Sequence, residues 1–248
     1  MSRGYDALRL FAVYGPVGAP KIIRRLLWRG GMVEFRNRGR TYVMPNELSA
    51  RYHLLESIDK LRDLAAFVGP DDRVIVDVGA HAGLFAAFAL EQAPEARLLC
   101  VEPDPHLAPV IARNLRMHSN WTLAQVAVTE RAGDAEFHRA ASSQESSLIR
   151  SMIRSTSEQV RVQTETLDAL CKDFETIDVL KVDVQGAEHH VLAGAEKTIK
   201  RVRTLLIEVT LMDALAHEVL AELVAEFGPW RVVNPVYAGA DLVFQRAN

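Results

Sequence analysis

Hydrophobic positions along the chain follow two patterns, one typical of buried strands and one typical of helices. Apolar runs without alternation occur at 74–78, 97–101, 177–184 and 204–209. Such runs indicate strands that are buried on both faces of a parallel sheet. Segments with apolar residues at helical spacing lie between them, at 84–90, 106–118 and 213–227. Strands that alternate with helices in this way predict a doubly wound, mostly parallel α/β sheet.

Several shorter segments extend this pattern. We expect a third parallel strand at 121–128, added strands at 135–138 and 160–166, a short helix from 167, and closing strands at 230–233 and 241–245. Residues 140–158 are rich in serine and threonine and match neither period. We interpret them either as a mobile surface loop that acts as a lid or as a disordered connection.

Residues 1–69 read as a small N-terminal extension, and residues 70–248 as the main domain. The extension is expected to hold short helices, a hairpin at 31–44 with its turn at 37–39, and a helix over about 50–67. The run at 22–29 is basic and amphipathic. It is expected to pack on the domain or on a second copy in a homo-oligomer. Contact with a membrane surface or an acidic partner is the alternative.

Composition narrows the class of protein. A chain of 248 residues with 49% hydrophobic and 25% charged residues is typical of a globular domain. The net charge of −3 provides no basic field, so no nucleic-acid partner is expected. No apolar run reaches the roughly 18 residues of a membrane span, and no signal peptide is recognised. The two cysteines are predicted to be reduced and buried, and the protein to be cytoplasmic.

Candidate chemistry begins where the first core strand ends. Asp77 closes that strand, and Gly79, His81 and Gly83 follow in a D-x-G-x-x-x-G pattern before a helix. A strand, a glycine turn and a helix form the first unit of a nucleotide-binding sheet. The spacing differs from the G-x-G-x-x-G of dinucleotide sites. An acid at the mouth of the loop would repel a pyrophosphate but suits a cationic amino group.

A second acid, Glu102, ends the next strand, 25 residues after Asp77. A carboxylate at this place can accept hydrogen bonds from ribose hydroxyls. Bare glycine backbone, an acid near an ammonium and an acid at a ribose favour S-adenosylmethionine (SAM) as the cofactor, with S-adenosylhomocysteine as its product. The alternatives are NAD, and a glycine turn that only permits close packing between strand and helix.

Five motifs resemble the FkbM family of SAM-dependent methyltransferases. They lie at 76–83, 101–105, 127–133, 162–170 and 177–188, and the last, Ile-Asp-Val-Leu-Lys-Val-Asp-Val-Gln-Gly-Ala-Glu, is the most specific. The resemblance covers roughly residues 70–210. It implies a seven-stranded Rossmann-like methyltransferase sheet and methyl transfer to a hydroxyl of a small molecule, such as a sugar or another secondary metabolite. Gln185 replaces the usual Glu of the family, and His81 replaces a frequent Asn.

The expected site residues fall into two groups. The cofactor group is Asp77, Gly79, Ala80, His81, Gly83, Glu102, Pro103, Asp104, Val126, Ala127 and Asp183. The catalytic group is Asp183, Glu188, His189 and Glu208. Asp183 or His189 is the expected general base. A divalent metal on Asp183 and Glu208 is the less favoured alternative, because Gln185 removes one acid. Ser146 and Ser147 are weaker candidates for closing over the cofactor.

Three functional hypotheses therefore remain. The first is an O-methyltransferase that acts on a hydroxylated small molecule. The second is a non-catalytic protein of the same fold that works as an oligomer or partner module. The third is methylation of RNA or protein, which would need a basic, aromatic face, and the aromatic content of 7% argues against it.

Overall fold

A computed structural model describes residues 31–45, 58–140, 143, 146–149, 157–210, 215–236 and 239–246. Three predicted features lie outside these residues: the short N-terminal helices, the basic run at 22–29 and the first part of the helix over 50–67. Residues 58–65 are helical, in agreement with that last prediction.

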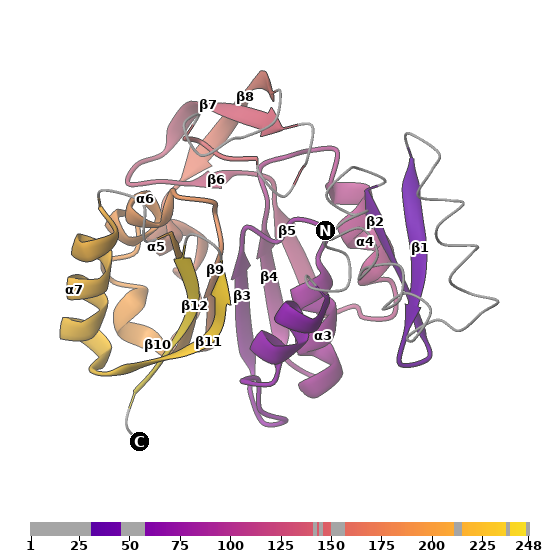
Figure 1. Cartoon of the computed structure of the whole chain (residues 1–248), viewed down its shortest axis with the longest axis horizontal. Helices are drawn as coiled ribbons and strands as arrows, with labels where there is room; N and C mark the ends of the chain where they lie inside the picture. Colours follow the sequence, from indigo (N-terminus) through magenta and orange to yellow (C-terminus); the bar gives the residue numbers. More distant parts are fainter. Residues whose placement is uncertain are drawn as a thin grey trace, which may run out of the picture.

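Seven strands form the central sheet, in the order β11-β12-β10-β9-β3-β4-β5. They are β3 (Val74–Val78), β4 (Arg97–Val101), β5 (Trp121–Ala124), β9 (Ile177–Val182), β10 (Val202–Thr210), β11 (Trp230–Val236) and β12 (Gly239–Gln245). Neighbours from β10 to β5 pair in parallel, and β12 is antiparallel to both β10 and β11. The predicted mostly parallel, seven-stranded sheet is confirmed (Figure 1).

Helices cover both faces of this sheet, as Figure 1 shows. The helices are α3 (Leu84–Gln92), α4 (Ala108–Asn114), α5 (Leu167–Leu170), α6 (Glu188–Ala193), the 3-10 turn η3 (Ile199–Arg201) and α7 (Ala216–Phe227). Ile75 packs in one core cluster with α3 and α4, whereas its neighbour Val76 packs in the other with α6 and α7. Alternate side chains of a strand point to opposite faces, so a strand that is apolar throughout is buried on both.

A separate three-stranded sheet, β6-β8-β7, lies beyond the carboxyl ends of the main sheet (Figure 1). Its strands are β6 (Ala127–Val128), β7 (Gly133–Ala140) and β8 (Ser157–Glu165). The single strand predicted at 121–128 was therefore wrong. β5 ends at Ala124, and β6 pairs with β8 instead. An apolar run shows that a strand is buried but not which neighbour it pairs with.

The predicted hairpin is confirmed as β1 (Met32–Asn37) and β2 (Arg40–Pro45). Its turn residues Arg38 and Gly39 both have positive φ, at 46° and 82°, as a tight two-residue hairpin turn requires. The hairpin belongs to the same core cluster as α3 and α4, through Tyr42 among others. Asn114 of α4 donates hydrogen bonds from Nδ2 to the carbonyls of Val43 and Ala82, and its Oδ1 accepts from the Val43 N–H. One buried amide thus joins the hairpin to the glycine loop.

Two further sequence predictions concern cysteines and membrane spans. Cys100 and Cys171 are both buried free thiols, as predicted. Within the described ranges, the helices are too short or too polar to cross a membrane.

Candidate functional site

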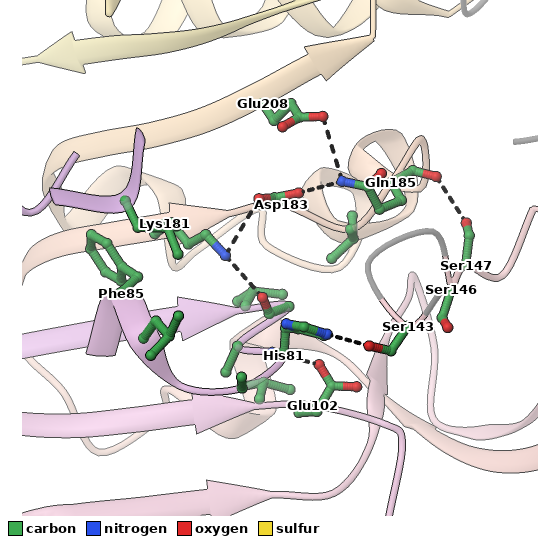
Figure 2. A pocket seen from close by; sticks show the side chains of 18 of the residues that line it. His81, Phe85, Glu102, Ser143, Ser146, Ser147, Lys181, Asp183, Gln185 and Glu208 are labelled. Carbon is green, nitrogen blue, oxygen red and sulfur yellow. Dashed lines mark hydrogen bonds and ion pairs between the residues drawn. The ribbon is translucent and has the colours of Figure 1, made fainter. Parts of the chain in front are cut away.

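A cavity of about 770 Å³ opens at the carboxyl ends of β3, β4, β9 and β10. This is the edge at which open α/β sheets bind their ligands. Nine of the residues predicted from the sequence line it: Gly79, Ala80, His81, Glu102, Pro103, Val126, Ala127, Asp183 and Glu208. Figure 2 shows Glu102 and Glu208 at opposite sides of this space, with His81 and Asp183 between them.

Ser146 and Ser147, the weaker candidates, also line the cavity, and the other predicted residues lie outside it. Asp77 is fully buried beneath the loop, and Asp104 accepts a hydrogen bond from the N–H of His106 at 2.9 Å. Glu188 is also buried, and its Oε1 accepts from backbone N–H groups of the preceding turn. His189 does not line the cavity either. Backbone hydrogen bonds account for Asp104 and Glu188, and neither Glu188 nor His189 lines the cavity, so their catalytic roles stay predictions.

The glycine loop is shaped by close backbone contacts. Gly79 has φ +75°, and a Cβ there would lie 1.9 Å from the carbonyl oxygen of Asp183. Gly83 has φ +71°, and a Cβ there would lie 3.3 Å from Ile111. His81 also has a positive φ, of 51°. The loop between the two glycines therefore places peptide groups, together with the His81 side chain, next to the cavity.

Glu102 holds the loop from the next strand. Its Oε2 accepts from the N–H of His81 at 2.8 Å, and its Oε1 accepts from the N–H of Asp104 at 3.0 Å. Burial raises the pKa of Glu102 to about 7, although both N–H groups favour the charged form. Each carboxylate oxygen has a second lone pair, so Glu102 retains the capacity to accept hydrogen bonds from a ligand.

His81 crosses the cavity toward the segment after β7. Its Nε2 lies 2.6 Å from Oγ of Ser143 (Figure 2). Burial and the nearby Lys181 lower the pKa of His81 to about 4, so the ring is neutral near pH 7. Farther along, Oγ of Ser147 donates to the carbonyl of Gln185 at 2.9 Å. These contacts bring parts of the serine-rich segment to the cavity, and its function as a lid stays a prediction.

A buried lysine links the two acids at the ends of β3 and β9. Nζ of Lys181 lies 3.2 Å from Asp77 and 3.8 Å from Asp183, and it donates to the carbonyl of Gly79 at 2.9 Å. Burial alone would lower the pKa of Lys181, but the two carboxylates outweigh it and raise that pKa. Asp77 therefore pairs with Lys181, which in turn donates to the Gly79 carbonyl of the loop.

The far end of the cavity holds a second polar group. Nε2 of Gln185 donates to Asp183 at 2.8 Å and to Glu208 at 3.5 Å (Figure 2). Burial opposes ionisation of Asp183, but Lys60 and Lys181 outweigh it and hold the pKa of Asp183 below its usual range. Burial and the charge of Asp183 raise the pKa of Glu208. Two carboxyl groups with pKa values moved in opposite directions can take different chemical roles.

Sequence reasoning did not assign two residues of this site. Lys181 stands in a strand that is otherwise apolar, and a lysine there signals a buried acidic partner. Lys60 hydrogen-bonds to Glu208 from the helix over residues 58–65. The sequence carries no signal for that contact, because it depends on where the helix packs. Among the described residues, no group of three or more His, Cys, Asp or Glu is arranged to hold a metal.

The chain is similar to several known methyltransferases. The chain is 31% identical over 163 residues to the 2-O-methyltransferase NoeI of Sinorhizobium fredii, covering 59% of this chain and 67% of NoeI. It is 29% identical over 203 residues to the 31-O-demethyl-FK506 methyltransferase FkbM of Streptomyces tacrolimicus, covering 68% of this chain and 78% of that protein. M. jannaschii TYW2, solved in complex with AdoMet, is 14% identical, covers 89% of each chain and superimposes with a TM-score of 0.49. The methyltransferase FkbM domain family matches residues 77–228, more than half of the chain, and the protein therefore belongs to this family.

Proposed function

We propose that this protein transfers a methyl group from SAM to a hydroxyl of a small molecule, such as a sugar or another secondary metabolite. One observation carries the proposal. A single cavity joins a glycine loop and a buried carboxylate, Glu102, at one end to a pair of acids, Asp183 and Glu208, at the other. The first end suits a nucleoside that carries an amino acid, and the second suits a hydroxyl that must lose its proton.

The cofactor end fits SAM by its chemistry. Glu102 would accept hydrogen bonds from the ribose hydroxyls, and the peptide groups of Gly79 to His81 would lie against the methionine portion. Val126 and Ala127 offer an apolar wall for the adenine. The neutral His81 ring adds no positive charge near the sulfonium, and Asp183 adds a negative one.

The acceptor end fits oxygen methylation. SAM supplies an electrophilic methyl group, so a bond forms from the acceptor oxygen to that carbon while the carbon–sulfur bond breaks and its electron pair stays on sulfur. Glu208 takes the hydroxyl proton, because its raised pKa makes it the better base of the acid pair. Asp183 stays ionised, and Gln185 fixes both carboxylates. Holding oxygen, carbon and sulfur in line supplies much of the rate.

The relatives support the choice of a hydroxyl. NoeI is named for 2-O-methylation, and the Streptomyces protein is named for methylation at an oxygen of FK506. The acceptor itself is best sought by testing hydroxylated products of neighbouring genes for release of S-adenosylhomocysteine.

A calorimetric titration with SAM tests the cofactor claim. Glu102→Ala removes hydrogen bonds to a charged acceptor and is expected to weaken SAM binding by about 10- to 100-fold. Glu95→Ala is the matched control, because Glu95 is an exposed acid just before the opposite end of β4. It should bind SAM like the wild type. Tight SAM binding by both variants, or none by the wild type, would remove the basis of the proposal and favour the non-catalytic module.

A further inference from the structure

Three carboxylates converge at the acceptor end: the pair already assigned to chemistry, Asp183 and Glu208, and a third, Asp241. Asp183 follows β9, Glu208 lies in β10 and Asp241 lies in β12. Glu208 and Asp241 are directly opposite each other in the antiparallel β10–β12 pair. Like charges at directly opposed positions destabilise a sheet. The side chain of Asp241 is only 2% exposed, so water screens little of this repulsion.

The compensating cation comes from the N-terminal extension. Nζ of Lys60 lies 3.1 Å from Asp241 and 3.8 Å from Asp183, and it hydrogen-bonds to Oε2 of Glu208. One ammonium therefore contacts carboxylates from three neighbouring strands. Its side chain is 21% exposed and lines the same cavity as Asp183 and Glu208.

The position of the Lys60 ammonium resembles, in chemical terms, that of a divalent metal ion. Converging carboxylates in a partly hydrated pocket are the ligands that Mg²⁺ and Mn²⁺ prefer. A lysine ammonium is a compact point charge with three donors, and here it is directed at three acids. We propose that Lys60 is a tethered cation, the positioning residue that holds Asp183 and Glu208 for the acceptor hydroxyl. With its ammonium between them, these acids are not arranged to hold a metal ion, in line with what is seen among the described residues.

The catalytic meaning of this inference rests on the proposed function, but its geometry does not. The inference makes the N-terminal extension part of the acceptor site, because residues 58–65 complete the far end of the cavity. It also assigns Lys60 a role distinct from that of Lys181, which serves the glycine loop through Asp77 and Gly79.

Manganese binding tests the inference without knowledge of the acceptor. Lys60→Met leaves three acids facing one another, and Mn²⁺ affinity, measured by electron paramagnetic resonance, should rise by roughly tenfold or more with one ion per chain. Adding Asp241→Asn to that variant should abolish the gain. Lys172→Met, which removes an exposed lysine, should bind Mn²⁺ no better than the wild type.

The outcomes separate this inference from the proposed function. If folded Lys60→Met binds Mn²⁺ no more tightly than the wild type does, the role of Lys60 is overturned, even if SAM still binds. If Lys60→Met is insoluble, the double variant Lys60→Met, Asp241→Asn must recover folded protein, because it removes one charge of each sign; failure to recover would also overturn it. Failure of the wild type to bind SAM would instead overturn the proposed function.

Discussion

Gly79 offers the sharpest test of how the loop is built. In Gly79→Ala, the new methyl group would stand 1.9 Å from the carbonyl oxygen of Asp183. That carbonyl is backbone and cannot rotate aside, and the N–H of Asp183 is itself bonded to the carbonyl of Val78 at 3.1 Å. The residue would also have to keep φ +75°, a region that alanine disfavours.

The two costs are separable. Holding alanine in the left-handed region costs about 1–2 kcal/mol. Forcing a methyl group into a packed backbone contact adds about 1–3 kcal/mol. We therefore expect Gly79→Ala to lower the free energy of unfolding by about 2–5 kcal/mol, a large part of the stability of a typical domain.

Gly39→Ala is the control for the first cost. Gly39 has φ +82° in the hairpin turn, and a Cβ there would meet nothing within 4 Å. It should lose only the roughly 1–2 kcal/mol of the conformational cost. Urea unfolding followed by circular dichroism gives both values. Equal losses for the two variants would refute the reasoning, since they would show that the contact with the Asp183 carbonyl exerts no steric force.

Two other predictions concern buried ionisable groups. Burial raises the pKa of Glu188 from 4.5 to about 8, so the folded state favours the protonated acid, and wild-type stability should fall as pH rises from about 4.5 to about 8. Glu188→Gln cannot ionise, so its stability relative to the wild type should rise across that pH range. The gain should be at most roughly 5 kcal/mol in urea unfolding, since one pKa unit is about 1.4 kcal/mol. A stability difference that does not depend on pH would contradict this. Burial raises the pKa of Cys171 to about 12 and that of Cys100 well above its ordinary value. Neither thiol should react with Ellman's reagent in the native protein, and both should react in urea; rapid native labelling would show that one is accessible.

The sequence was sufficient for four adjacent strands of the sheet and for the two residues Gly79 and Glu102 at the edge where the cavity opens. Apolar runs without alternation indicate strands that are buried on both faces of a sheet. This pattern predicts that β3, β4, β9 and β10 lie in one sheet, as they do. The positions of Gly79 and Glu102 relative to those runs then place them at the same sheet edge. These features are local, so a local pattern can predict them.

The acceptor end was less predictable, because its contacts join distant parts of the chain. Lys60 meets acids that follow it by more than a hundred residues, and no spacing rule connects them. Glu188 was predicted to be catalytic, and its side chain turns back to accept hydrogen bonds from the backbone of its own turn. Only the packed structure decides which way such a side chain points.

The hydrogen bonds of Asn114 cross the domain boundary that the sequence predicts at residue 70. Its amide satisfies the Val43 N–H and both the Val43 and Ala82 carbonyls. A protein shortened to begin at residue 70 would lose both hydrogen bonds between this amide and Val43, which water would replace at a net cost of about 0.5–1.5 kcal/mol for each bond. The loss would be at Asn114, whose remaining hydrogen bond holds the Ala82 carbonyl of the glycine loop. What looks like an appendage in the linear sequence is, through this amide, a support of the glycine loop at the edge of the cavity.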